Sequence, residues 1–275
     1  MRAWLNGEIT DLDVPLIGLL DHGFTVGDGV FETMRTTPSG DAFALTRHIE
    51  RLRRSAAGLG LIPPDPDEVA VAVRSVLAAN PNADLSHGRV RVTFTSGHGP
   101  LGSDRGPGPQ TLAVVVQPGK PWPETTTVAV PPWPRNERSP LVGLKTTSYA
   151  ENAVALAWAK ERGFSEAVLG NLAGDMCEGT GSNVFVVIDG QALTPSLESG
   201  CLNGITRQLV MEWGDVPERD LPLQILDTAD EVFITSSTRD VHPVVAVGER
   251  ELPVGPVTRE LADLFAERSA ADIDP

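Results

Sequence analysis

Val142–Asn152, with the sequence VGLKTTSYAEN, is the stretch from which this chain is best interpreted. Lys145 is one of only three lysines and has apolar or small neighbours, whereas Lys120 and Lys160 lie in proline-rich and charged segments. Removal from water lowers the pKa of an amine, and a neutral lysine forms Schiff bases with carbonyl compounds. In isolation the segment fits an exposed loop lysine in a salt bridge better, because lysines with a perturbed pKa are exceptions, and the rest of the chain reverses that preference.

Composition sets the class of protein. The chain has 275 residues, of which 41% are hydrophobic and 21% are charged, which is typical of a globular protein of one or two domains. Its formal net charge of −15 argues against nucleic-acid binding and against adhesion to an anionic membrane. No run approaches the ~18–20 apolar residues of a membrane span, and the first residues do not resemble a signal peptide. Cys177 and Cys201 fit neither a metal site nor a disulfide framework, so we expect a reduced, cytoplasmic protein without bound metal.

Strands and helices alternate on both sides of Lys145. Asn6-Gly7 predicts a hairpin. We predict strands over residues 29–37, 41–46, 88–97 and 111–118, a helix capped by Thr46, and a second helix over 67–80. After a proline-rich stretch with one short strand at 125–130, we predict helices over 148–163, 204–214 and 256–269 and strands over 165–171, 183–190, 191–195 and 231–237.

This pattern predicts an α+β protein with two domains. We place the first over residues 1–118 and the second over 125–275, with 119–124 as the linker. Crevices between domains are common ligand sites, so we expect the functional site there.

A Schiff-base cofactor such as pyridoxal 5′-phosphate needs an acid at its pyridine nitrogen and donors for its phosphate. Glu178 precedes an apolar strand and could supply the acid, although a solvated turn residue is the common alternative. Ile205 and Thr206 open a helix and would direct free N–H groups at an anion, unless this is an ordinary helix start. Arg51, by default a surface arginine, and the Ser237 hydroxyl are further candidate phosphate ligands.

Six stretches in this order resemble the class IV (fold type IV) pyridoxal phosphate enzymes, which include branched-chain and D-amino acid aminotransferases and 4-amino-4-deoxychorismate lyases. They are DHGFTVGDGVFETMR, LTRHIERLRRSA, GLKTTSYAENAVA, CEGTGSNVFVV, LNGITR and EVFITSSTRDV, and they extend from about residue 5 to 245. The resemblance implies a small N-terminal α/β sandwich, a larger C-terminal pseudo-barrel and a homodimer acting on a small amino substrate.

The resemblance also implies a role for each matching residue. Lys145 forms the Schiff base and moves protons at the substrate α-carbon, and Glu178 pairs with the pyridine nitrogen. Tyr149 interacts with the hydroxyl of the cofactor ring, and Asn183 packs against the face of that ring. The implied phosphate ligands are Arg51, Ile205, Thr206 and Ser237.

Two features depart from a simple match. The family often has arginine where this chain has His22, which is either a specificity difference or a tolerated surface change, and we favour the surface change. Gly97–Gly102 matches the glycine spacing of a dinucleotide-binding loop, but the residues that follow cannot open a helix, so we expect a flexible substrate-side loop. Arg89 and Arg91, on one face of the preceding strand, are candidates for binding a substrate carboxylate, with a solvated strand face as the alternative.

The branch of the family is a separate prediction. The GDGVFET form of residues 27–33, the lysine-to-tyrosine spacing and the short chain favour a 4-amino-4-deoxychorismate lyase, which releases 4-aminobenzoate and pyruvate. The alternative is an aminotransferase for D-amino or branched-chain amino acids. A non-catalytic protein that only binds the cofactor is disfavoured, because Lys145, Glu178 and Arg51 are all present.

Overall fold

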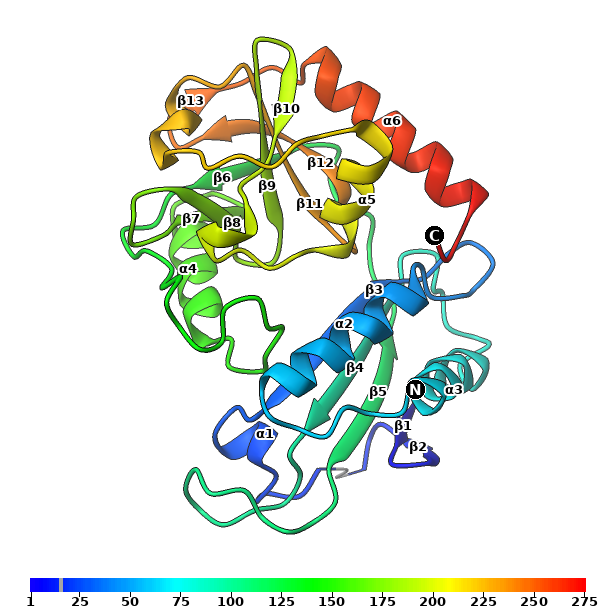
Figure 1. Cartoon of the computed structure of the whole chain (residues 1–275). Coiled ribbons are helices and arrows are strands. Elements are labelled where there is room, and N and C mark those ends of the chain that lie inside the picture. Colours follow the sequence, from blue (N-terminus) through cyan, green and yellow to red (C-terminus); the bar gives the residue numbers. More distant parts are fainter. Residues whose placement is uncertain (15–16) are drawn as a thin grey trace. The chain divides into compact units, whose positions relative to one another are not determined.

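The chain divides into two compact units in the computed structural model, which describes residues 1–14 and 17–275 (Figure 1). Unit 1 contains Met1–Pro121, Leu144–Tyr149 and Asp272–Pro275, and unit 2 contains Trp122–Gly143 and Ala150–Ala271. This division differs from the boundaries predicted above, because two later segments fold with unit 1. The Phe31 N–H donates to the Lys145 carbonyl at 2.9 Å, and the Ala44 N–H donates to the Ile273 carbonyl at 2.7 Å.

Unit 1 is a five-stranded antiparallel sheet in the order β2-β1-β5-β4-β3. Its strands are β1 (Arg2–Leu5), β2 (Glu8–Asp11), β3 (Gly29–Arg35), β4 (Arg89–Thr95) and β5 (Thr111–Gln117), and its helices are α1 (His22–Thr25), α2 (Leu45–Gly58) and α3 (Pro66–Ala78). The predicted hairpin forms, with Asn6 and Gly7 both at positive φ as a tight turn between twisted strands requires.

Helices α2 and α3 cover one face of this sheet (Figure 1). Their apolar faces bury Leu52, Val73 and Val76 against the alternate inward residues of the strands, such as Val92 and Val114. Asp65 caps α3 by accepting from the N–H groups of Asp67 and Glu68, and Pro66 occupies the first turn.

Two predictions for this unit are wrong. Residues 41–46 do not form a strand, since only an isolated bridge joins Thr36 to Ala42 before the chain enters α2. Thr46 is not the cap of α2, because that helix already begins at Leu45 after Ala44, a residue at φ 53° that offers no capping side chain.

Unit 2 is built on an eight-stranded mixed sheet in the order β10-β9-β11-β12-β6-β7-β8, with β13 paired to β12. Parallel pairs join β6 to β12 and to β7, and the other pairs are antiparallel. Its strands are β6 (Thr126–Ala129), β7 (Glu166–Gly170), β8 (Met176–Gly179), β9 (Asn183–Ile188), β10 (Gln191–Leu193), β11 (Glu231–Ser236), β12 (Asp240–Val247) and β13 (Arg250–Glu251).

Three α-helices belong to unit 2: α4 (Ala150–Glu161), α5 (Ile205–Gly214) and α6 (Pro256–Ala271), along with short 3₁₀ turns at Leu197–Ser199 and Leu223–Asp227. The core lies among β-branched and aliphatic side chains of the central strands, including Val184, Val232 and Ile234. Strands β8, β12 and β13 are absent from the sequence prediction. In β8 the run MCEG has no alternation, because all four residues are buried.

Candidate active site

Lys145 lies in unit 1, on a short segment that pairs with the start of β3. The Thr147 N–H donates to the Gly29 carbonyl at 2.8 Å, the Thr147 hydroxyl donates to the Gly27 carbonyl at 2.9 Å, and an isolated bridge joins Val30 to Thr146. The Lys145 N–H donates to the Ser55 hydroxyl of α2 at 3.2 Å. These contacts fix the position of the backbone from which the Lys145 side chain projects.

The Lys145 amine lies in a cluster with aromatic and cationic side chains. Its Nζ is 4.4 Å from the centroid of the Phe31 ring, and the Tyr149 ring meets the same ring edge-on at 5.4 Å. The Arg91 guanidinium carbon is 3.3 Å from the Phe31 centroid. Burial lowers the pKa of Arg91 to about 10, so the side chain remains a cation at neutral pH.

Only one of the two candidate strand arginines belongs to this cluster. In the β3–β4 register Arg91 is opposite Thr33, whose hydroxyl it approaches at 3.4 Å, so it shares a face with Phe31. Arg89 is opposite Arg35, at the other end of β3. The structure therefore distinguishes two arginines whose positions in the sequence are equivalent.

Arg51 is buried, and it pairs with a carboxylate on β3. Its Nε and Nη2 donate to the two Glu32 oxygens at 2.7 and 2.8 Å, while His48 Nδ1 lies 2.6 Å from Glu32 Oε2. Burial alone would raise the pKa of Glu32, but the charges and hydrogen bonds of Arg51 and His48 hold it well below its usual range. Burial lowers the pKa of His48, so the neutral ring donates its Nδ1–H to the carboxylate.

Neither Glu32 nor His48 was singled out from the sequence, although a signal was available. Glu32 shares a face of β3 with Val30 and Met34, both buried, and a charged residue there requires a partner from the helix above it.

His22 corrects an expectation, because it is not a surface residue. Its side chain is 1% exposed, and Nε2 donates to the Pro100 carbonyl at 2.8 Å. Its imidazole lies against Gly99, where an added Cβ would come within 2.4 Å of Nε2. His22 therefore holds the loop that follows β4, and replacement by a longer side chain would displace that loop.

The loop over residues 97–110 is anchored at both ends. An isolated bridge joins Asp21 to His98, and the Gly99 N–H donates to the Leu20 carbonyl. On the far limb Arg105 donates to both Asp28 oxygens at 2.7 Å and to the carbonyls of Leu59 and Gly60. The hydrogen bond from Arg105 lowers the pKa of Asp28, consistent with a tight ion pair.

Glu178 lies in unit 2, buried on β8 rather than solvated in a turn. Arg135 Nε lies 3.1 Å from Oε1, and the Leu202 N–H donates to Oε2 at 2.8 Å. A cation and an N–H group thus stabilise the ionised carboxylate. Arg135 was missed because it lies in the proline-rich stretch interpreted as connecting chain, where nothing local indicates a partner 43 residues away.

The turn formed by Leu202, Asn203 and Gly204 leads from this carboxylate into α5. Asn183 Nδ2 donates to the Leu202 carbonyl at 2.7 Å, so its amide holds the turn. Gly204 is the N-cap of α5 and has no side chain to satisfy the helix N–H groups. Helix α5 begins at Ile205, as predicted, and Ser237 follows the end of β11.

The predicted residues fall into two groups, one in each unit. Unit 1 brings Lys145, Tyr149 and Arg91 together on Phe31, and His48 of the Arg51 cluster experiences the Lys145 charge. Unit 2 brings Glu178 and Asn183 to the turn that opens α5.

Within residues 1–14 and 17–275, no group of three or more histidine, cysteine, aspartate or glutamate side chains is arranged to hold a metal ion. Among the helices of this described part of the chain, none has the length and apolarity to cross a bilayer.

Known proteins of similar sequence and structure include several aminotransferases. The family model for amino-transferase class IV matches residues 29–247. A Methanocaldococcus jannaschii protein, provisionally assigned as a branched-chain-amino-acid aminotransferase, is 34% identical over 97% of this chain and 96% of its own. The D-alanine aminotransferase of Staphylococcus haemolyticus is 28% identical over 96% of both chains.

Among solved structures, the branched-chain aminotransferase of Thermoproteus uzoniensis with norvaline matches with a TM-score of 0.90. It is 30% identical, and the match covers 97% of this chain and 94% of that one. The predicted α+β architecture is confirmed, and the structure shows it as a small antiparallel sheet in unit 1 and a larger mixed sheet in unit 2.

Proposed function

Because this chain belongs to the class IV aminotransferase family, we propose that it is a pyridoxal phosphate-dependent aminotransferase that moves the amino group of an amino acid to a 2-oxo acid. The observation that carries the proposal is the cluster on Phe31, where a primary amine and a guanidinium lie within 4.4 Å and 3.3 Å of one ring centroid. The amine can form a Schiff base with a carbonyl group, and the guanidinium can bind a carboxylate through paired hydrogen bonds.

Unit 2 offers groups that fit the pyridine and phosphate of this cofactor. Glu178, in contact with Arg135 and the Leu202 N–H, would bind the protonated pyridine nitrogen. The N–H groups at the start of α5, which Gly204 leaves without a side-chain cap, together with the Ser237 hydroxyl, would receive the phosphate. Arg135, which the sequence did not suggest, would take part by forming an ion pair with Glu178.

Unit 1 offers the reacting amine and an arginine that could bind the phosphate. Pyridoxal phosphate, when bound, supplies an aldehyde for amines and a ring that accepts electrons. Lys145 would bind that aldehyde, and its amine, once released by the substrate, would carry a proton at the substrate α-carbon. Arg51 would meet the phosphate, with Glu32 and His48 fixing its guanidinium. Tyr149 packs edge-on against Phe31 and so limits water around the amine.

Arg91 is our candidate for a substrate carboxylate, and Arg89 is not. Arg91 is largely buried beside Phe31 and close to Lys145, so its charge is poorly screened and an anion there would gain more than at the surface. Branched-chain and D-amino acids are the substrate classes to test first, since they are the ones named for the relatives.

An aminotransferase is better supported than the lyase that the sequence motifs favoured. The relatives described above are named as aminotransferases. The motif form, the lysine-to-tyrosine spacing and the chain length, which favoured a lyase, bear only indirectly on the reaction.

The deciding experiment is a two-arm assay of the purified protein with pyridoxal phosphate. One arm supplies D- and L-amino acids with 2-oxoglutarate or pyruvate, and the other supplies 4-amino-4-deoxychorismate without any 2-oxo acid. We expect amino transfer that requires both donor and acceptor, lost in Lys145→Ala and retained in Lys160→Ala, a matched exposed lysine. Sustained 4-aminobenzoate release without an acceptor would instead identify a lyase.

We also propose that the chain acts as a homodimer. Unit 1 exposes a set of large apolar side chains in the segment before β3 and in the 97–110 loop, and exposed apolar side chains that gather on one surface commonly mark protein–protein contacts. The set consists of Leu12, Val14, Ile17, Leu19, Leu20, Phe24, Val26 and Leu101. A second copy of the chain would cover these residues.

A further inference from the structure

Arg207 is a buried arginine in the first turn of α5. The residue is 1% exposed. A cation there is opposed by the partial positive charge of the helix N-terminus, and its burial is costly unless every donor finds a partner. Its Nε has no hydrogen-bond partner among the described residues, so Arg207 is a poor choice for stability alone.

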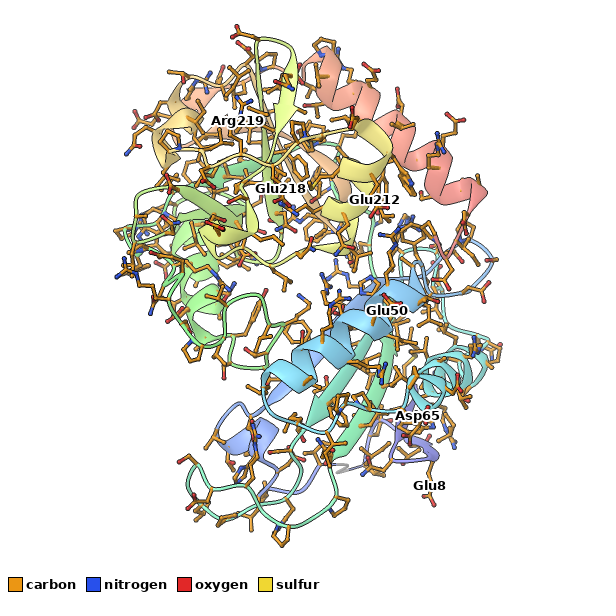
Figure 2. All side chains as sticks on the ribbon, in the orientation of Figure 1. Glu8, Glu50, Asp65, Glu212, Glu218 and Arg219 are labelled. Atoms are coloured by element: carbon orange, nitrogen blue, oxygen red, sulfur yellow. The ribbon has the colours of Figure 1, made fainter. Side chains whose placement is uncertain are left out.

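The other nitrogens of Arg207 connect three separate parts of unit 2. Nη2 donates to the Pro195 carbonyl at 2.8 Å and to Glu218 Oε1 at 2.7 Å. Nη1 donates to Asn203 Oδ1 at 3.2 Å. Figure 2 labels Glu218, on the segment that follows α5. Arg207 thus joins the chain on either side of the Leu202–Asn203–Gly204 turn to the turn itself.

That turn is the link between the two candidate cofactor contacts of unit 2. At its beginning the Leu202 N–H donates to Glu178, and at its end Gly204 opens α5. Asn183 holds the Leu202 carbonyl, and an added Cβ at Gly204 would come within 2.0 Å of Asn183 Oδ1. A small shift of Asn203 would therefore move the helix N–H groups relative to Glu178.

We propose that Arg207 is a positioning residue that holds this turn so that the uncapped N–H groups of α5 keep their aim at the cofactor phosphate. The inference rests on the proposed function, because it takes pyridoxal phosphate as the ligand. Glu218 neutralises and orients the Arg207 guanidinium. Asn203 accepts a hydrogen bond from that guanidinium and so fixes the backbone of the turn.

The test compares affinity for pyridoxal phosphate with affinity for pyridoxal, which lacks the phosphate. Arg207→Lys keeps the charge but cannot bridge three partners with a planar fork. Glu218→Gln removes the charge of one partner and Asn203→Ala removes another partner, and Glu218 is only partly buried, so these variants are suited to remain folded if Arg207→Lys does not. Arg219→Gln, an exposed neighbour labelled in Figure 2, is the matched control.

Dissociation constants are measured by absorbance or fluorescence titration, and folding by circular dichroism. We expect Arg207→Lys, and to a lesser degree Glu218→Gln and Asn203→Ala, to weaken pyridoxal phosphate binding by about tenfold, the loss of one charge-assisted contact. Pyridoxal binding should change less than about threefold, and Arg219→Gln should match the parent protein.

Two outcomes would overturn the proposal, and a third would refute the proposed function. Unchanged affinity for pyridoxal phosphate in folded variants would show that Arg207 does not position the turn. Equal losses for both compounds, or losses that follow thermal stability alone, would assign it a merely structural role. A parent protein that binds neither compound would instead refute the proposed function on which this inference rests.

Discussion

At the scale of the residue, this protein places buried charges in pairs among the residues of its candidate site. Glu32 with Arg51 and His48 in unit 1, and Glu178 with Arg135 in unit 2, are each enclosed carboxylates with a cation in contact. Replacing a buried ion pair with apolar residues often stabilises a fold, so such pairs are weak evidence of a purely structural purpose. Their retention beside Lys145 and α5 is what a site for a charged ligand would need.

Removing one partner of such a pair should cost far more than removing an exposed charge. Glu32→Gln leaves Arg51 buried beside an amide that cannot balance its charge, and we expect a loss of about 3–5 kcal/mol in the free energy of unfolding. Urea unfolding followed by circular dichroism would measure it. Glu50→Gln is the control, an exposed acid next to Arg51 on α2 that Figure 2 labels, and it should change stability by about 0.5 kcal/mol or less.

His48 makes stability depend on pH. Burial holds its pKa below the ordinary value of 6.5, so the unfolded chain binds more protons as the pH falls through that value, and the free energy of unfolding decreases. The pKa of Glu32 is also lowered in the folded protein, so protonation of this carboxylate destabilises the fold in the same direction, but only as the pH falls below its ordinary value of 4.5. His242 is also held neutral by burial and by Arg239, and it adds a similar decrease.

We therefore expect a loss of stability between pH 7.5 and pH 5 that is smaller in His48→Gln, on the order of 1 kcal/mol less. Urea titrations at the two pH values would measure the difference. His87→Gln, which changes an exposed histidine, should leave the pH dependence as in the parent protein. A His48→Gln profile parallel to the parent profile would contradict the assignment.

At the scale of the element, helix α2 is capped by a distant part of the chain. Its N-cap residue, Ala44, has no side-chain acceptor. Asp274 accepts from the Thr46 N–H at 2.8 Å and from its hydroxyl at 2.6 Å, and Arg47 Nε donates to the Pro275 carbonyl. His48 lies in this first turn of α2 and contacts Glu32, so the cap formed by Asp274 also supports the contact between His48 and Glu32.

Asp274→Ala should destabilise unit 1 by about 1 kcal/mol, the usual value of an N-cap. Asp65→Ala, which removes the ordinary cap of α3, gives the comparison, and Figure 2 labels this residue. Thermal unfolding would compare both with Asp263→Ala, an exposed acid on α6. If Asp274→Ala is as stable as Asp263→Ala while Asp65→Ala is not, the cap at 274 contributes nothing.

At the scale of the whole molecule, the proposed dimer is open to direct measurement. The chain mass is 29.2 kDa, so sedimentation velocity should give a species of twice that mass. Replacing Leu19 and Phe24 with aspartate puts two charges into the exposed apolar set, where desolvation on association would cost several kcal/mol, and should shift the protein to monomer. Leu197→Asp, an exposed leucine in unit 2, is the control.

The sequence by itself determined the class of protein and most of its elements. Turn chemistry at Asn6-Gly7, the helical spacing of Ile49, Leu52 and Ala56 in α2 and the apolar runs of β9 and β11 are local patterns, and they act over a few residues. The ordered set of motifs around Lys145, Glu178 and the start of α5 identified the family for the same reason, since each motif is a short contiguous string.

Only the tertiary structure decided which residues act together. It put Lys145 with unit 1, chose Arg91 over Arg89, buried His22 against Pro100 and gave Glu178 its partner Arg135. It also brought Asp274 to Thr46, 228 residues away along the chain. Buried charges and caps are satisfied by whichever group the fold brings within about 3 Å, and no local pattern of residues encodes that distance.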